Sequence, residues 1–419
     1  MRISKLLSFL TCAVVLLVSV TNKSYEVNPV LDLLSVKASA DTVSSYKAGD
    51  IIKFGWYPQS EVTDAEVISA LNEIAGDKKD WTSYDYYLGS DTFTDGKMFP
   101  ADYMCYKDVN YGSEKYRGVI FDSYRQLNTL SFLSENCQQM NGYIIDTIYW
   151  FKYEPIKWRV LDPSTGMVMS ETVLDAQAFN NYLLEENIPD PYNDVTYWGD
   201  SAKTFYANNY EKSSIREWLN NDFYNTAFSP SQQEIIEYTE LDNSAYLISC
   251  SAYNSDSVND KVYLLSCNDV LNADYGFSSS VDDDIARQAT GSDYAKCQGL
   301  GVSDGISDWR LRTPGVNSAA AYRVDGDGMV YDRYCYTVST DYGIRPALNL
   351  NLESDILQSN VVMSDLIPGE DDEVRPENNK IWIVIIAIII SLVIIAAVLL
   401  AFLANKKRKM RMNVDMSFN

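Results

Sequence analysis

Hydrophobic residues are concentrated in two long runs, one near each end of the chain. The first run, residues 6–20, follows Arg2 and Lys5. A short basic segment before about 7–15 apolar residues is typical of a secretory signal. The second run, residues 381–404, carries no charge, and about 20 apolar helical residues suffice to cross a bilayer. The two runs predict an N-terminal signal peptide and a C-terminal transmembrane helix.

The charges around the second run predict its orientation. Five basic residues lie between positions 406 and 411, whereas the residues before the run are acidic and contain prolines. The positive-inside rule places the basic tail in the cytoplasm and the main part of the chain outside the cell. The expected organisation has five parts: a signal peptide (1–40), an extracellular domain (41–352), an acidic stalk (353–380), a transmembrane helix (381–404) and a basic cytoplasmic tail (405–419).

Between the two runs, apolar residues alternate with polar ones where strands are expected. Residues 149–162 alternate on both sides of Pro155, which predicts two strands with one buried face. Another strand is expected from Gly49 to Pro58, and the apolar stretch 260–270 predicts a buried strand.

Helical periodicity appears in shorter stretches with recognisable start signals. Thr63 with Glu66, and Ser214 with Glu217, have the spacing of a capping box. Pro230 suits the first turn of a further helix. Strands mixed with a few short helices predict an α+β fold.

Composition narrows the possible functions. The chain has 58 acidic and 34 basic residues and a net charge of −24, which disfavours binding to nucleic acid. Its 31 tyrosines argue against disorder. It contains no histidine, so mechanisms that need a histidine of this chain are excluded, including serine–histidine triads and histidine zinc sites.

The cysteines leave two interpretations open. Cys12 lies within the predicted signal peptide, and six further cysteines follow it. An even number in an exported chain permits disulfides, but six cysteines allow 15 connectivities. A buried free thiol is the alternative for each of them.

The stretch SDWRLRTPG, residues 307–315, places two arginines among apolar residues. In a strand, Trp309 would face one way, and Arg310 and Arg312 the other. Covered arginines need carboxylate or carbonyl partners, because a lone buried charge is costly. We therefore predict structural roles for this group rather than a catalytic or ligand role; its members are Trp309, Arg310, Arg312, Pro314, Gly315 and, further along the chain, Arg345.

Between about residue 47 and residue 352, seven segments follow one another in order: KFGWYPQSEV, YWFKYEPIKWRVL, SSIREWLNNDFYNTAFS, DKVYLLS, DYAKCQGL, WRLRTPG and YGIRPALNL. The set resembles a bacterial family of exported or membrane-anchored proteins that is catalogued as a domain of unknown function. Its last two segments are similar to the end of C-type-lectin-like domains, which formylglycine-generating enzymes share. The resemblance implies a loop-rich α+β fold with a mixed or antiparallel sheet. Formylglycine-generating enzymes use two closely spaced cysteines, and Cys335 has no such neighbour in the sequence, so that activity is not expected.

A few residues are candidates for binding or catalysis. Tyr192 and Trp198 lie in a polar stretch and are candidates for stacking on a sugar ring, although packing aromatics are more common. Asp325 and Asp327, in DGDG, are weak candidates for Ca²⁺, with a hairpin turn as the alternative. No other cofactor is expected. Two carboxylates could also hydrolyse a glycosidic bond, but an acidic chain always offers such pairs.

The sequence therefore predicts a bacterial cell-surface protein held by one membrane span. Its extracellular domain is expected to bind a glycan, peptide or protein, and no enzyme activity is expected. The alternatives are an extracellular hydrolase that uses carboxylates, and a structural or sensory domain without a small ligand.

Overall fold

The computed structural model describes residues 46–84, 104–125, 127, 136–180, 206–332, 335–336 and 339–358. All of them belong to the first of two compact units, Met1–Pro368. The strands are β1 (Ile51–Glu61), β2 (Thr82–Ser83), β3 (Met104–Tyr111), β4 (Glu114–Phe121), β5 (Tyr149–Asp162), β6 (Met167–Ser170), β7 (Asp175–Ala176), β8 (Ile236–Glu237), β9 (Thr239–Leu241), β10 (Val258–Asp260), β11 (Trp309–Pro314), β12 (Ala321–Val324), β13 (Val330–Tyr331), β14 (Gly343–Ile344) and β15 (Ala347–Leu350).

The helices are short. The α-helices are α3 (Ala65–Ala75), α4 (Cys137–Met140), α5 (Ser214–Trp218), α6 (Tyr224–Ala227), α7 (Pro230–Gln233), α8 (Cys267–Val270), α9 (Asp293–Cys297) and α10 (Asp355–Gln358). The other helical turns are η1 (Lys78–Asp80), η3 (Leu219–Phe223), η4 (Ile248–Tyr253) and η5 (Ala273–Tyr275).

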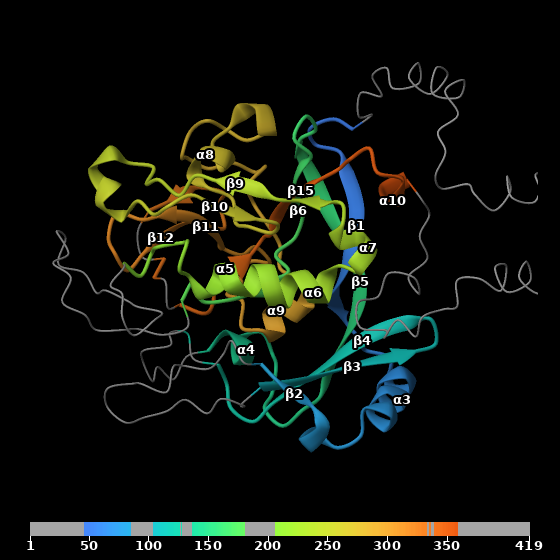
Figure 1. The fold of residues 1–419 in the computed structure, drawn as a ribbon. Coiled ribbons are helices and arrows are strands. Elements are labelled where there is room, and N and C mark those ends of the chain that lie inside the picture. The colour runs from blue at the N-terminus through green and yellow to red at the C-terminus, as the bar shows by residue number, and fades with distance from the viewer. Residues whose placement is uncertain are drawn as a thin grey trace, which may run out of the picture. The chain divides into compact units, whose positions relative to one another are not determined.

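Within the described residues the strands form three sheets (Figure 1). The largest has the order β2-β3-β4-β5-β6-β15-β8, and β1 also pairs with β5. A second sheet has the order β13-β12-β11-β14-β7, in which β11 and β14 run parallel and the other pairs are antiparallel. Strands β9 and β10 form a separate antiparallel pair.

Strand β5 is the centre of the large sheet and corrects the sequence prediction for residues 149–162. It is one continuous strand of 14 residues, although it contains Pro155. Pro155 is tolerated because its partner β1 is irregular between Lys53 and Trp56, where Gly55 has a φ of 70°. Strand β1 likewise runs past Pro58 to Glu61, and its register is irregular there too.

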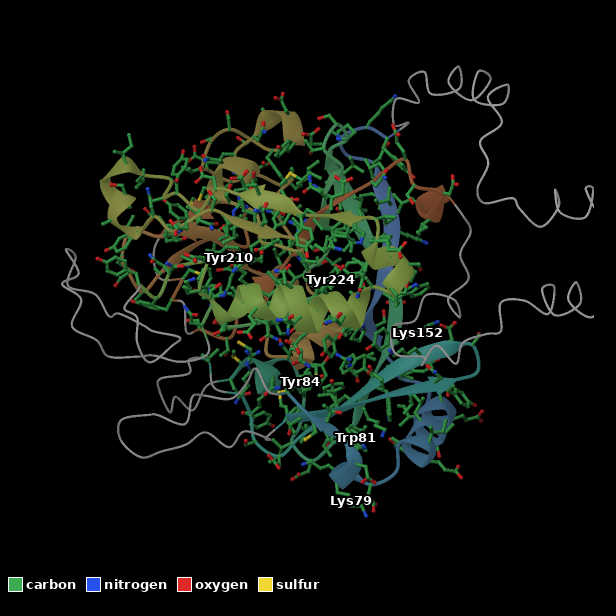
Figure 2. The ribbon with its side chains drawn as sticks, in the orientation of Figure 1. Lys79, Trp81, Tyr84, Lys152, Tyr210 and Tyr224 are labelled. Atoms are coloured by element: carbon green, nitrogen blue, oxygen red, sulfur yellow. The ribbon has the colours of Figure 1, made fainter. Side chains whose placement is uncertain are left out.

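Both faces of β5 are covered, where one buried face was expected. Phe151 packs in the main core between the sheets and helices. Trp150 packs on the opposite side in a smaller core with Trp81 and Leu71 of helix α3. Figure 1 shows α3 against β3 and β4, and Figure 2 labels Trp81 in the same part of the molecule.

Two predicted helices begin slightly away from the expected capping residues. Asp64, not Thr63, caps α3 by accepting from the backbone N–H groups of Glu66 and Val67. Ser213, not Ser214, caps α5 by accepting from the N–H of Arg216. In both cases the neighbouring residue also has a side-chain oxygen that can cap a helix, so the sequence places the helix start only to within a residue.

Helix α7 begins as predicted. Ser229 accepts from the N–H of Gln232, whose side chain accepts from the N–H of Ser229, and Pro230 occupies the first turn. We expect Ser229→Ala to lower the free energy of unfolding by about 1 kcal/mol, because it leaves one N–H of the helix without its cap. Urea unfolding measures this, with Ser257→Ala, at an exposed position before β10, as the control. Equal stability of the two variants would contradict the capping role.

Most residues of the stretch 260–270 are buried, but the prediction of a strand there is wrong. Strand β10 ends at Asp260, and helix α8 begins at Cys267. Ser266 and Asp269 form a capping box that the apolar pattern concealed. Between these two elements, Tyr263 makes only a single bridge to Ala347 of β15.

The six cysteines outside the predicted signal peptide are free thiols and all are buried. Burial raises the pKa of Cys137 to about 12 and that of Cys335 to about 11. These thiols are therefore neutral near pH 7 and poor nucleophiles. Of the two interpretations left open by the sequence, the structure favours the free thiol.

The predicted fold class, an α+β C-type-lectin-like fold with a C-terminal transmembrane helix, is wrong. The described residues form a mixed helix-and-sheet fold with more strand than helix. No helix among them is long and apolar enough to span a bilayer. The apolar run 381–404, on which that prediction rested, lies outside the described residues. Hydropathy indicates whether a segment favours water or an apolar environment. It does not establish the secondary structure that the segment forms.

Candidate functional site

A row of arginine and tyrosine side chains crosses the second sheet from its edge strand β13. In the antiparallel register, Arg310 of β11 lies opposite Arg323 of β12, and Arg323 lies opposite Tyr331 of β13. Residues directly opposite each other in such pairs point to the same face of a sheet. Tyr342 joins the row because the next residue, Gly343 of β14, pairs with β11.

The rings of this row separate two like charges. The guanidinium carbon of Arg323 lies 4.9 Å from the ring centre of Tyr331 and 5.5 Å from that of Tyr342. The guanidinium carbon of Arg310 lies 4.8 Å from the same Tyr342 ring. Two cations directly opposite each other would destabilise a strand pair, whereas the negative face of an aromatic ring attracts a cation. Tyr342 therefore compensates for the pairing of the two arginines.

Asp308 anchors the row at its half-exposed end. Its Oδ2 lies 2.9 Å from Nε of Arg323, and its Oδ1 accepts from the N–H of Gly326 at 3.0 Å. The side chain of Asp308 is 34% exposed and that of Arg323 is 14% exposed. We call Asp308, Arg310, Arg323, Tyr331 and Tyr342 the Arg323 cluster.

Two carboxyl groups at the cluster have perturbed proton affinity. Burial raises the pKa of Asp308, the carboxylates of Asp325 and Asp341 raise it further, and Arg323 opposes the effect. Burial also raises the pKa of Asp341, against the influence of Arg310. Carboxyl groups with raised pKa values beside arginines are more frequent at functional sites than elsewhere.

Arg310 forms the floor of the cluster and bonds to the backbone of Tyr336 and Ser339 beside it. It is fully buried and donates to the carbonyl oxygens of Gln177 (3.1 Å), Tyr336 (3.0 Å) and Ser339 (2.6 Å). Its third nitrogen lies 3.2 Å from Sγ of Cys335. These contacts hold the backbone of Tyr336, whose side chain is 42% exposed.

Arg345 and Arg312, the other arginines of the predicted structural group, bond to carbonyl and carboxylate oxygens of the interior. Arg345 is fully buried and donates to the carbonyls of Ser170, Glu171 and Arg287. It also lies over the ring of Trp309, and burial lowers its pKa to about 9. The nearby positive charge of Arg159 contributes to that shift.

Arg312 donates to the carbonyl of Leu264 at 2.8 Å and to the carboxylate of Asp269 at 2.9 Å. Pro314 ends β11 and is buried. A side chain on Gly315 would lie 2.7 Å from the carbonyl oxygen of Ala320, which explains a glycine at this turn.

Among the remaining predicted binding residues, Asp325 lies near the Arg323 cluster, where its carboxylate raises the pKa of Asp308. Tyr192 and Trp198 lie outside the described residues. Asp325 and Asp327 lie in the turn between β12 and β13, where Oδ1 of Asp325 accepts from the N–H groups of Asp327 and Met329. In the described part of the chain, no group of three or more cysteine, aspartate or glutamate residues could hold a metal ion.

A second perturbed carboxyl lies deep in the core. Asp175 of β7 is fully buried and accepts from the Tyr57 hydroxyl at 2.6 Å, the N–H of Ala176 at 2.7 Å and the Gln177 amide at 3.0 Å. Burial raises its pKa to about 6. Its contacts link β7 to β1, and since it is wholly enclosed we assign it to the interior rather than to a site.

Sequence reasoning missed Asp308, Arg323, Tyr331, Asp341 and Tyr342. A usable signal was present for two of them. The DGDG turn sits between Val324 and Val330, so a hairpin centred on it places Arg323 opposite Tyr331. The chain contains no comparable local signal for Tyr342 or Asp308.

The described residues form a mixed helix-and-sheet domain. Its arginine–tyrosine row lies on the five-stranded sheet. A family model described as a domain of unknown function, DUF6273, matches residues 167–352, which include the whole Arg323 cluster. No curated protein and no solved structure matches the chain. The comparisons therefore confirm the domain of unknown function, and they give no support to a bacterial origin or to likeness with C-type lectins or formylglycine-generating enzymes.

Proposed function

We propose that this domain binds a ligand at the Arg323 cluster. The observation that carries the proposal is the partial exposure of Arg323 and its ion-pair partner Asp308, which distinguishes Arg323 from the enclosed arginines of the region. Arg310 and Arg345 are enclosed and donate to backbone carbonyls, which is what a structural arginine does. Arg323 reaches the surface, forms an ion pair with a half-exposed carboxylate and lies against two half-buried tyrosines.

Such a surface combines the features of a recognition site. Binding sites join aromatic side chains with a small number of placed polar groups. Arginine and tyrosine are also the residues most often found to dominate binding energy. The exported, cell-surface location stays a prediction from the sequence.

A screen of glycans and peptides with the full-length protein tests this proposal. For any ligand found, we expect Arg323→Met to weaken binding at least about tenfold, since the guanidinium group is lost from the centre of the site. Isothermal titration calorimetry gives the affinities.

Arg159→Met is the matched control. Arg159 forms a half-exposed ion pair with Glu171 in the large sheet, with side chains 23% and 30% exposed. If the two variants weaken binding equally, or neither does, the ligand does not bind at the cluster.

A carboxylate-dependent hydrolase is the second candidate. Asp308 and Asp341 both have raised pKa values and each responds to Arg323, so one of them could act as a proton donor beside an ionised partner. Turnover of a bound polysaccharide that Asp341→Asn abolishes, while binding persists, would favour this candidate over simple binding.

A further inference from the structure

We infer that the domain has a second binding site, which takes a carboxylate group carried by an apolar or aromatic scaffold. The site consists of Tyr224 of α6, Tyr238 between β8 and β9, and Lys261, which follows β10. Figure 2 labels Tyr224 on the helical stretch that begins with α5. We call these three residues the Lys261 site. None of them belongs to the Arg323 cluster, so the site is independent of the proposed function.

The ammonium group of Lys261 has neutral partners, although the chain contains 58 acidic residues. It donates to the hydroxyl oxygen of Tyr224 and to the carbonyl oxygen of Gln233, each at 2.8 Å. Among the described residues no carboxylate forms an ion pair with it. An ammonium group has three donors, and half-buried charges are usually paired. The positive charge of Lys261 therefore suits an anionic group of a ligand.

Asn220 fixes the backbone at Lys261. It lies in η3, a π-helical turn between α5 and α6, and such turns are frequent at functional sites. Its side-chain oxygen accepts from the N–H groups of Lys261 at 3.1 Å and Val262 at 3.2 Å. Its side-chain nitrogen donates to the carbonyls of Val262 at 2.9 Å and Arg216 at 3.1 Å. A lysine whose backbone is held in this way loses less freedom when it binds a ligand.

Tyr238 supplies an apolar surface beside this charge. It is 72% exposed, whereas Tyr224 is half-buried. The Nζ atom of Lys261 lies 5.3 Å from the ring centre of each tyrosine. A carboxylate bound at Nζ therefore has its apolar substituent within reach of the Tyr238 ring. Aromatic rings pack favourably on apolar and aromatic groups while their hydroxyl groups stay in water.

Acidic neighbours limit the charge of the ligand. Glu237 and Glu240, on either side of Tyr238 in the sequence, are exposed, and the whole chain has a net charge of −24. Repulsion from these groups grows with the charge of the ligand, whereas one ammonium group compensates a single negative charge. A carboxylate therefore suits the Lys261 site better than a phosphate dianion.

The test uses four small probes, the full-length protein and ligand-observed NMR titrations. N-acetylphenylalanine has both a carboxylate and a ring, and its amide has the ring without the charge. Acetate has the charge without the ring, and phenyl phosphate has the ring with a dianion. We expect N-acetylphenylalanine to bind at least about tenfold more tightly than each of the other three. Arg323→Met should leave this binding unchanged, because Arg323 is not part of the Lys261 site.

Two variants test the two parts of the site. Lys261→Met should weaken the binding of N-acetylphenylalanine at least about tenfold, and Tyr238→Ala about threefold to tenfold. The matched controls are Lys157→Met, at an exposed lysine of β5, and Tyr111→Ala, at a tyrosine of β3 that is 42% exposed. Neither control should change the binding. Circular dichroism verifies that each variant is folded. If Lys261→Met does not fold, because its contact with Gln233 is lost, Tyr238→Ala decides.

A carboxylate site at Lys261 is excluded if N-acetylphenylalanine does not bind, or if Tyr238→Ala leaves its binding unchanged. It is also excluded if the amide binds as tightly as the acid, because the ammonium group then plays no part. Tighter binding of phenyl phosphate would show that the ligand is of another class. If Arg323→Met weakens binding of the probe and Lys261→Met does not, the probe binds at the Arg323 cluster, which overturns the second site and supports the proposed function.

Discussion

Replacing Arg287 with methionine should lower the free energy of unfolding by about 3–5 kcal/mol, the largest effect we expect from a single substitution in this domain. Arg287 is fully buried although it lies in a loop. Its guanidinium group donates to five backbone carbonyls, those of Val270, Ser278, Ser280, Asp282 and Gly328. Methionine fills similar volume but leaves all five acceptors without this donor.

The loss should be larger than that of an ordinary surface charge. Lys157→Met, at an exposed position of β5, is the control and should change stability by less than about 0.5 kcal/mol. Urea unfolding followed by tryptophan fluorescence measures both variants. A loss below about 1 kcal/mol for Arg287→Met would mean that water replaces the guanidinium group without cost, contrary to our interpretation.

Asp175 should make the domain less stable as the pH rises from about 4 to about 6. In the unfolded chain its pKa is near the ordinary value of 3.8, and in the folded domain burial raises it to about 6. The folded state therefore binds this proton more tightly, so its contribution to stability is complete at low pH and is lost as the pH rises through the folded pKa. A difference of about 2 pKa units corresponds to about 3 kcal/mol.

Comparison with Asp175→Asn isolates this contribution from those of other titrating groups. At pH 7 the variant should be more stable relative to the unmodified protein than it is at pH 3.5, by about 3 kcal/mol, since asparagine carries no charge to bury. Unfolding by urea across this range gives the difference between the two proteins at each pH. A difference that does not change with pH would show that Asp175 does not titrate between these values.

Several individual strands and helices could be predicted from the sequence. Alternating residues located β5, and side-chain oxygens before apolar periods located helices α3, α5 and α7 to within a residue. The same reasoning failed where tertiary packing, and not the local sequence, determines the secondary structure. The stretch 260–270 is apolar because it is enclosed, and enclosure alone does not distinguish a strand from irregular chain followed by a helix.

The Arg323 cluster could be predicted only in part, for a similar reason. Arg323 and Tyr331 meet through a local hairpin, which a turn sequence can indicate. Arg310 meets Tyr342 because β11 and β14 lie parallel, and pairing between distant parallel strands leaves no local pattern. The arginines of WRLRTPG stood out in the sequence, whereas the surface arginine beside them did not.

Burial of the six described cysteines protects their thiols from oxidants and alkylating reagents while the domain is folded. A reagent can reach the described cysteines only when the surrounding chain opens, because all six are covered. The rate at which iodoacetamide labels them therefore reports how often the domain opens. The six described cysteines form no disulfide, so the folded structure around them is stabilised by packing, hydrogen bonds and ion pairs rather than by covalent cross-links.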